Sequence, residues 1–294
     1  MHVGAFTYLV DTEGCRLSFR RNFDRMPFAF AHRFHISDHF SLDALRDLAI
    51  RIGPKQNRWY VEEGDTQAKN GWGTPFTGRP LEESIANIGH HRSFVMLKRV
   101  QEDPEYEPIL GGLQAELSDL LGIRVGSRYR DGLMTVLITS PDRVTPYHLD
   151  GEANLLMQIR GSKSVHIFDG NDREVVPGDE LERFWSGDIK APLYKRHLQD
   201  RASTFELVPG GGVTNPVAFP HWVQNGSQVS ISLSVNFKRA IDDSADAHKV
   251  NRQLRRFGLK PLPPGRARIL DHTKGVAYRT AKRVKSYIAV RSGK

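Results

Sequence analysis

The sequence predicts a mainly β fold with flanking helices, built around a barrel of short strands. Segment 145–150 (TPYHLD) places His148 two residues before Asp150, and a second histidine, His221, follows further along the chain. Alternate residues of an extended segment point to the same side, so His148 and Asp150 are able to reach one metal ion from one strand end. Segment 228–237 (QVSISLSVNF) alternates apolar and polar residues, which is the pattern of a half-buried strand. The many glycines and prolines suit short strands and turns.

Two imidazoles and one carboxylate are the donors of a 2-His-1-carboxylate facial triad, which occupies one face of an octahedral Fe(II) and leaves the other face open. His221 has to come from a second strand, on the other side of the barrel. A His-x-Asp triplet is common by chance, and a lone histidine is more often an ordinary hydrogen-bonded side chain than a ligand. The prediction therefore depends on the strands that surround His148, Asp150 and His221.

Lys163 is the next residue that the pattern singles out. Segment 154–168 (NLLMQIRGSKSVHIF) reads as two strands joined at Gly161-Ser162, which predicts a short hairpin. Lys163 is the first residue of the second strand, and it alternates in step with the apolar Val165 and Ile167. Its side chain is therefore expected to point inward, as theirs do. An unpaired ammonium is costly there, and an inward Lys163 therefore indicates a buried anionic ligand. The alternative is a solvated lysine at a strand start, since most lysines are solvated.

Segments 145–168 (TPYHLDGEANLLMQIRGSKSVHIF) and 220–237 (PHWVQNGSQVSISLSVNF) resemble the JmjC/cupin-like Fe(II)- and 2-oxoglutarate-dependent oxygenases. The motif is closest to that of the asparaginyl hydroxylase that inhibits the hypoxia-inducible factor, and the resemblance covers roughly residues 130–238. It implies a double-stranded β-helix, a distorted jelly roll, with Fe(II) as cofactor and 2-oxoglutarate and O2 as co-substrates. In that chemistry 2-oxoglutarate gives succinate and CO2 while a C–H bond of the substrate is hydroxylated.

The resemblance assigns roles to residues that match the family motif in type and spacing. It implies that His148, Asp150 and His221 are the iron ligands and the catalytic centre. Lys163 matches the strand lysine that pairs with the far carboxylate of 2-oxoglutarate, and Thr145 matches a threonine whose hydroxyl helps to hold the same carboxylate.

Two asparagines and one tyrosine complete the implied co-substrate site. Asn154, four residues after the aspartate, and Asn236, fifteen after the second histidine, match asparagines that line its inner end. From the residues alone, both are equally compatible with ordinary turn or edge positions. Parity also leaves open whether the polar face that carries Asn236 looks into a cavity or into solvent. The family tyrosine has only Tyr129 as a weak counterpart.

The implied function is hydroxylation of a protein, peptide or amino-acid-like substrate. Oxidation of RNA or of a small metabolite stays open, as does a non-enzymatic cupin-like protein that regulates or binds. Cupins of other chemistry usually present a His-x-His pair and a glutamate, and His148-x-Asp150 lacks the second imidazole.

Composition agrees with a folded enzyme. The 294 residues are 39% hydrophobic, which is enough for one large core with smaller appendages. The single cysteine, Cys15, excludes an internal disulfide and suits a reducing compartment. Neither a signal-peptide pattern nor an apolar run of membrane-spanning length is found, so we expect a cytoplasmic protein without a membrane partner.

Three regions are predicted along the chain. Residues 1–125 are expected to form an accessory α/β layer that packs on the barrel, 126–238 the catalytic core, and 239–294 a basic helical tail. N-cap, proline and apolar-stripe signals predict helices and one strand outside the core. The helices are expected at 42–52, 80–88, the later part of 104–122, 179–185, 244–257 and 276–290, and the strand at 93–100.

The tail carries the basic character of the protein. Residues 238–294 contain sixteen lysines and arginines and four aspartates, a net charge of +12; since the whole chain carries +8, residues 1–237 carry about −4. Segment 276–290 has an apolar stripe at helical spacing, including Val284, Tyr287 and Ile288. Such a stripe packs on the domain or on a partner, and the resemblance implies a homodimer through this tail. A nucleic-acid-binding arm is the alternative.

Overall fold

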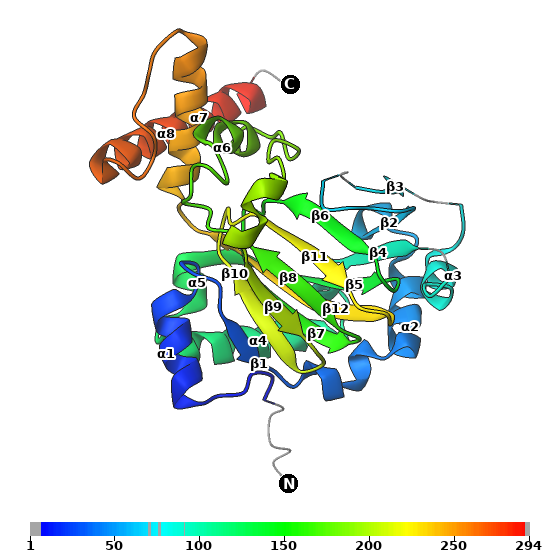
Figure 1. The fold of residues 1–294 in the computed structure, drawn as a ribbon. Helices are drawn as coiled ribbons and strands as arrows, with labels where there is room; N and C mark the ends of the chain where they lie inside the picture. The colour runs from blue at the N-terminus through cyan, green and yellow to red at the C-terminus, as the bar shows by residue number, and fades with distance from the viewer. Residues whose placement is uncertain (1–6, 70–71, 76–77, 91, 292–294) are drawn as a thin grey trace. The chain divides into compact units, whose positions relative to one another are not determined.

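The strands form two antiparallel sheets, drawn in Figure 1 from a computed structural model that describes residues 7–69, 72–75, 78–90 and 92–291. One sheet has eight strands in the order β1-β10-β7-β12-β5-β4-β2-β3, and the other has four in the order β6-β11-β8-β9. Their bounds are β1 Ala29–Ala31, β2 Trp59–Glu63, β3 Thr74–Pro75, β4 Ser93–Lys98, β5 Tyr129–Thr139, β6 Val144–His148, β7 Ala153–Arg160, β8 Lys163–Ile167, β9 Ser203–Leu207, β10 Gly211–Asn215, β11 His221–Asn225 and β12 Ser230–Arg239.

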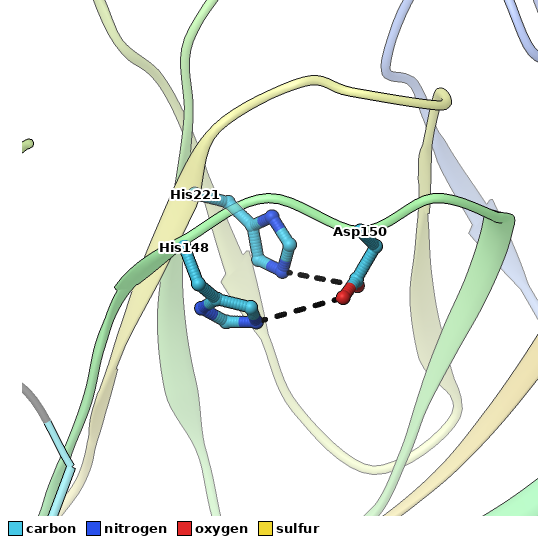
Figure 2. Close-up of side chains that lie close together, drawn as sticks. All are labelled: His148, Asp150 and His221. Atoms are coloured by element: carbon cyan, nitrogen blue, oxygen red, sulfur yellow. Dashed lines mark ion pairs between the residues drawn. The ribbon is translucent and has the colours of Figure 1, made fainter. Parts of the chain in front are cut away.

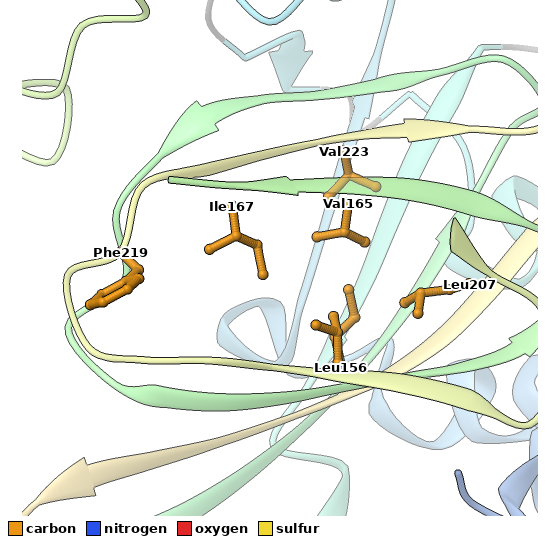
Figure 3. Close-up of a cluster of buried hydrophobic side chains, with 7 residues drawn as sticks. Leu156, Val165, Ile167, Leu207, Phe219 and Val223 are labelled. Carbon is orange, nitrogen blue, oxygen red and sulfur yellow. The ribbon is translucent and has the colours of Figure 1, made fainter. Parts of the chain in front are cut away.

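The two sheets face each other across a buried apolar cluster (Figure 3). The larger sheet contributes Leu156 of β7 and Val213 of β10, which are directly opposite in register. The smaller sheet and one loop contribute the remainder: Val165, Ile167, Leu207, Phe219 and Val223. Two antiparallel sheets packed in this way, with helices on the flanks, give the jelly-roll-like architecture that the sequence predicts.

The hairpin predicted at Gly161-Ser162 is wrong. The strands on either side, β7 and β8, belong to different sheets, so the chain crosses from one sheet to the other at this point. Gly161 has a φ of +69°, and a Cβ there would lie 2.6 Å from the carbonyl oxygen of Val229. A hairpin and a crossing between sheets can both use a short turn with a glycine in the left-handed region. The sequence pattern therefore does not distinguish the two connections.

The strand predicted at 228–237 is β12, but it is not half-buried. It lies between β7 and β5 in the large sheet, and both of its faces are covered. Its polar face points toward the smaller sheet, because Ser234 is opposite Leu156 of the apolar cluster. Gln158 satisfies two of the buried serines there, since its amide donates to Ser230 Oγ (3.0 Å) and its Oε1 accepts from Ser232 (2.7 Å).

Helices and short 3-10 turns cover the outer face of the large sheet. Helix α2 (Leu42–Ile52) has the predicted bounds and the predicted cap, since Ser41 Oγ accepts from the Ala44 N–H at 3.2 Å. The other helices are α1 Glu13–Asn22, α3 Leu81–Ala86, α4 Glu107–Leu121 and α5 Val125–Arg128. The 3-10 turns Phe34–Ile36, Asp38–Phe40, Gln56–Arg58 and Val100–Glu102 accompany these helices. Another, Arg196–Arg201, lies on the outer face of the small sheet, where Gln199 contacts His166 and Trp222.

The chain divides into two compact units. One comprises residues 1–170 and 194–239, with both sheets, and the other comprises 171–193 and 240–294. The second unit holds α6 (Gly178–Trp185), α7 (Asp243–Arg256) and α8 (Arg268–Arg291), close to the predicted helices except that α8 begins earlier. No helix in the described part of the chain is long and apolar enough to cross a membrane.

Asp24 ties the N-terminal helix to the sheet that carries the core. Its buried carboxylate accepts two hydrogen bonds from the Arg239 guanidinium, at 2.6 and 2.7 Å, and one from the Tyr129 hydroxyl at 3.2 Å. It also accepts the backbone N–H of Val217, in the loop that leads to His221, at 3.1 Å. One carboxylate therefore joins the segment after α1, the loop before β11 and one end of the β5–β12 pair, where Tyr129 is opposite Arg239.

Replacing this carboxylate should destabilise the fold measurably. Asp24→Asn keeps a residue that tolerates the φ of +58° at this position but removes the charge that pairs with Arg239. We expect a loss of about 2–3 kcal/mol in the free energy of unfolding, measured by urea denaturation. The matched control is Asp65→Asn, whose exposed pair with Arg92 should contribute no more than about 0.5 kcal/mol. Equal effects of the two substitutions would contradict this role.

Candidate metal centre

Strand pairing between β6 and β11 brings the two predicted histidine ligands together. His148 is the last residue of β6, His221 is the first of β11, and the two are opposite each other in the antiparallel register. Asp150 follows in the turn that leads to β7, and its carboxylate points back to both rings (Figure 2). The structure thus places all three predicted ligands at one site.

The three side chains are close enough to share one ion. Asp150 Oδ1 lies 4.0 Å from His148 Nε2, and Asp150 Oδ2 lies 3.6 Å from His221 Nε2. One donor atom from each residue lies within 4.8 Å of the others. This is the only such group of three or more His, Cys, Asp or Glu side chains within the described ranges.

Hydrogen bonds to backbone carbonyls orient both rings. His148 Nδ1 lies 2.6 Å from the carbonyl oxygen of Pro146, and His221 Nδ1 lies 3.1 Å from that of Phe219. A carbonyl only accepts, so a proton on Nδ1 satisfies it and leaves Nε2, the atom turned toward Asp150, with a free lone pair. Rings held in this way are typical of metal-bound histidines.

The electrostatics of the site also suit a cation. Burial, and then the neighbouring His148, lower the pKa of His221 to about 4, so its ring is neutral at pH 7. Burial, and then the charge of Asp150, raise the pKa of Glu152. Two imidazoles and one carboxylate on one side, with Asp150 still partly exposed, fit a divalent transition metal with open positions.

A β-bulge aligns Thr145 with the histidines. Thr145 and His148 are three residues apart, and in a regular strand they would point to opposite faces. The β6–β11 register shifts between His221 and Val223, so that His148 is opposite His221 while Thr145 is opposite Val223. Since Val223 belongs to the interior cluster, the register places Thr145 on the same interior face as the ligands.

Lys163 lies on this face at the far end of the small sheet. It is 5% exposed and alternates with the buried Val165 and Ile167, as its parity predicts. In the described part of the chain no carboxylate pairs with it, and burial lowers the pKa of its ammonium to about 7. A buried lysine in this state is a candidate anion-binding group.

Asn154 and Asn236 are opposite each other on β7 and β12, on the interior face of the large sheet. The Asn154 amide donates to Asn236 Oδ1 and, at 2.7 Å, to Ser234 Oγ. The polar face of β12 therefore looks into the interior and not into solvent. Tyr129, by contrast, is engaged with Asp24 and packs on Phe237, so the structure gives it no place beside these asparagines.

Two residues beside the ligands were not predicted. Trp72 packs its ring edge-on against His148, with ring centroids 5.2 Å apart, from a loop that carries no sequence signal. Asn215, the last residue of β10, places its amide 2.9 Å from His221 Nδ1. It precedes His221 by six residues, and neither parity nor motif connects the two.

The fold matches solved structures, although no protein-family model matches the sequence and no curated protein matches it. The X-ray structure of YcfD from Escherichia coli has a TM-score of 0.52 at 17% identity, over 89% of this chain and 63% of that one. YcfD is described as a ribosomal oxygenase. Its complexes with cobalt and succinic acid (17% identity) and with cobalt and 2-oxoglutarate (16%) each match with a TM-score of 0.52.

The likeness to these two complexes covers 93% of this chain and 67% of theirs. This chain therefore spans about two thirds of the length of the YcfD structures. At such low identity the likeness concerns the arrangement of strands and helices. The chain accordingly shares the fold of a ribosomal oxygenase, with a His-Asp-His group at the point where β6 and β11 meet.

Proposed function

We propose that this protein is an Fe(II)- and 2-oxoglutarate-dependent oxygenase of the JmjC type, on a double-stranded β-helix, that hydroxylates its substrate. One observation carries the proposal. A His148, Asp150 and His221 group shares its interior face with a buried lysine, Lys163, that has no anionic partner among the described residues. A metal site and a separate anion site on one face fit a metal-chelating dicarboxylate.

The three ligands would hold Fe(II) from one side and leave positions for the co-substrates. When bound, Fe(II) supplies the redox chemistry with O2 that couples conversion of 2-oxoglutarate to succinate and CO2 with transfer of one oxygen atom to a substrate C–H bond. The protein contributes ligand orientation, through the two carbonyl contacts of the rings, and a low-dielectric site.

The order of side chains along the small sheet suits an extended dicarboxylate. His221 pairs with Ile167, Val223 with Val165, and Asn225 with Lys163. The metal ligands thus occupy one end of the face and Lys163 the other. Ile167, which is opposite His221, is four residues from Lys163 along β8, or about 13 Å between their Cα atoms. The ammonium would hold the far carboxylate of 2-oxoglutarate by a charge-assisted hydrogen bond.

Polar side chains between and beside these ends would complete the co-substrate site. Thr145 is in the row between the ligands and Lys163, and its hydroxyl forms no hydrogen bond within the part of the chain that the structure describes. Asn154 and Asn236 bond to each other on the opposite sheet, which orients their amides toward the interior. Trp72, packed on His148, would limit the access of water on that side.

The comparisons support the cofactors. The YcfD structures that share this fold contain cobalt, a common substitute for Fe(II), with 2-oxoglutarate or succinic acid. The acceptor class we propose is a protein, peptide or amino-acid-like molecule, because YcfD is a ribosomal oxygenase and the sequence motif resembles that of an asparaginyl hydroxylase. The alternatives are an RNA base or a small metabolite as acceptor, or a protein that binds a ligand without catalysis.

The triad should be required for metal binding and turnover. Wild-type protein is expected to bind one equivalent of Co(II) by calorimetry and to release succinate from 2-oxoglutarate only with Fe(II), even without substrate. His148→Ala, Asp150→Ala and His221→Ala each remove one of three ligands, so each should lose stoichiometric metal binding and succinate release. His166→Ala, a histidine of the neighbouring strand outside the group, is the control. Wild-type metal affinity in any triad variant would refute the site.

Lys163 should be needed for the binding of 2-oxoglutarate but not for the binding of the metal. Lys163→Met keeps a long side chain but removes the charge, so 2-oxoglutarate binding should weaken by about 2–4 kcal/mol while Co(II) binding is retained. The substitution should also stabilise the ligand-free protein at pH 7, because it removes a buried ammonium that has no anionic partner among the described residues. Unchanged 2-oxoglutarate affinity would place the co-substrate elsewhere.

The affinity for 2-oxoglutarate should depend on pH, because binding needs the charged form of Lys163. In the ligand-free protein the pKa of Lys163 is about 7, below its ordinary value, and a bound dianion raises it. Above pH 7 the lysine must take up a proton to bind, so affinity should fall as pH rises from 7 to 9. Calorimetry at pH 8 in two buffers should detect this uptake in the wild type and not in Lys163→Met.

We also propose that α8 forms a homodimer contact. Residues 280–288 of this helix are all exposed, including the apolar Val284 (53%) and Ile288 (59%). These two side chains are one helical turn apart on one face, so they suit a matching helix of a second copy. The resemblance to JmjC oxygenases supports this role, and the basic residues around the stripe support nucleic-acid binding as the competing outcome.

Glutamates on the apolar face should separate the dimer. Val284→Glu with Ile288→Glu should reduce the mass in light scattering from twice 33.3 kDa to 33.3 kDa, because charge would be buried at the contact. Ser286→Glu, exposed on the other side of the same helix, should not. A wild-type monomer would refute the dimer, and salt-sensitive RNA or DNA binding that is lost on truncation at Arg239 would then assign the tail to nucleic acid.

A further inference from the structure

We infer that Asp24 positions two of the candidate metal ligands, although it contacts neither of them, by holding one turn of the loop between β10 and β11. This inference rests on the proposed function, whose metal site it concerns. The loop comprises residues 216–220, and residues 216–219 form the turn. Asp24 is a positioning residue, since it acts on the ligands only through this turn.

The turn has a backbone conformation that its own sequence does not favour. Phe219 donates its N–H to the carbonyl oxygen of Pro216 at 3.2 Å, and Ala218 has a φ of +61°. A positive φ at the third position of a hydrogen-bonded turn is the mark of a type II turn, in which glycine is usual because it has no Cβ. A residue such as alanine keeps this conformation only where the surrounding structure imposes it. The turn therefore depends on the contacts around it.

Two backbone groups of the turn contact metal ligands. The Ala218 N–H donates to the carbonyl oxygen of Asp150 at 2.9 Å, and the Phe219 carbonyl oxygen lies 3.1 Å from His221 Nδ1. Neighbouring residues of one turn thus contact a ligand that follows β6 and a ligand that begins β11. A displacement of the turn would shift both ligands relative to His148, whose ring contacts a carbonyl of its own strand.

Asp24 accepts the remaining N–H of the turn. Val217 donates this N–H to Asp24 Oδ1 at 3.1 Å. Because Pro216 and Pro220 have no N–H, every backbone N–H of the loop then has a partner. The Asp24 side chain is 5% exposed and is itself held by two hydrogen bonds from Arg239. A fixed carboxylate therefore holds the residue next to the one that contacts the Asp150 carbonyl.

A second support of the turn is segment 168–170. The Phe168 N–H donates to the carbonyl oxygen of Pro220 at 2.9 Å. A Cβ added at Gly170 would clash with the Ala218 carbonyl oxygen and would lie 3.0 Å from the Phe219 ring, so this backbone approaches the turn closely only as glycine. The turn is thus held by Asp24 and by segment 168–170, and a change at either support should alter the ligand positions.

Two substitutions of Asp24 separate positioning from stability. Asparagine and glycine both tolerate the φ of +58° at this position. Asp24→Asn loses the charge that pairs with Arg239 but keeps an oxygen for the Val217 N–H, whereas Asp24→Gly loses both. Calorimetry with Co(II) should give wild-type affinity for Asp24→Asn and a loss of about 10–100-fold for Asp24→Gly, the range typical of groups that orient metal ligands. If Asp24 served stability alone, the two folded variants would bind Co(II) equally.

Gly170→Ala disturbs the turn while Asp24 stays intact, so it also serves if Asp24→Gly does not fold. Its Cβ must displace the Ala218 carbonyl, and Co(II) affinity should fall about tenfold or more. The control is Gly89→Ala, where a Cβ would make an ordinary contact with Val229 at 3.8 Å, and its Co(II) affinity should be that of the wild type.

Nuclear magnetic resonance of the metal-free protein gives a readout that does not depend on the metal. In Asp24→Gly the Val217 and Ala218 N–H groups should exchange with solvent about tenfold faster, as expected for the loss of one hydrogen bond, and the ring signals of His221 should shift. Asp24→Asn should show the wild-type exchange and ring signals.

Wild-type exchange, ring signals and Co(II) affinity in both Asp24→Gly and Gly170→Ala would overturn the inference. Absence of Co(II) binding in the wild type would instead overturn the proposed function. In that case the exchange rates and ring signals of the metal-free variants would still decide whether Asp24 holds the turn and the His221 ring.

Discussion

The pairing of β6 with β11 is the interaction on which the site depends. It places His148 opposite His221, and its bulge brings Thr145 onto the same face although three residues separate Thr145 from His148. A regular register would turn one of these side chains to the outer face of the sheet, because a shift of one residue reverses every direction. The irregularity of this ladder therefore aligns Thr145 with the candidate ligands, and bulges of this kind are concentrated beside functional sites.

Part of the interior is polar, beside the apolar cluster that joins the two sheets. Ser230, Ser232 and Ser234 point inward from β12 and are buried, in part against Gln158. Each buried hydroxyl needs a partner, so a purely structural core would gain from replacing them by alanine or valine. Small polar side chains become favourable if the space between the sheets receives a charged molecule, and the buried Lys163 across that space imposes the same requirement.

The sequence was most informative where a local rule decides the structure. The parity of Lys163 depends on strand alternation and the cap at Ser41 on the first turn of a helix, and each has the expected placement. Asp150 lies near His148 as expected from their spacing, although it is in the turn after β6 and not in the strand. Pairing partners are set by contacts distant in sequence. For that reason Gly161 was assigned to a hairpin although it connects two sheets, and Asn215 gave no signal although it contacts His221.

The same distinction explains why the likeness to YcfD is found in structure and not in sequence. At 17% identity most positions differ between the two chains, and a protein interior tolerates exchanges as long as volume and polarity are kept. The proposed ligands His148, Asp150 and His221 are a different case, because metal binding needs an imidazole or a carboxylate at each position and the register fixes which residue supplies it. A short motif around His148, Asp150 and Lys163 therefore holds most of what the sequence predicts of the proposed chemistry, while the likeness of the strands around it is found only in the structure.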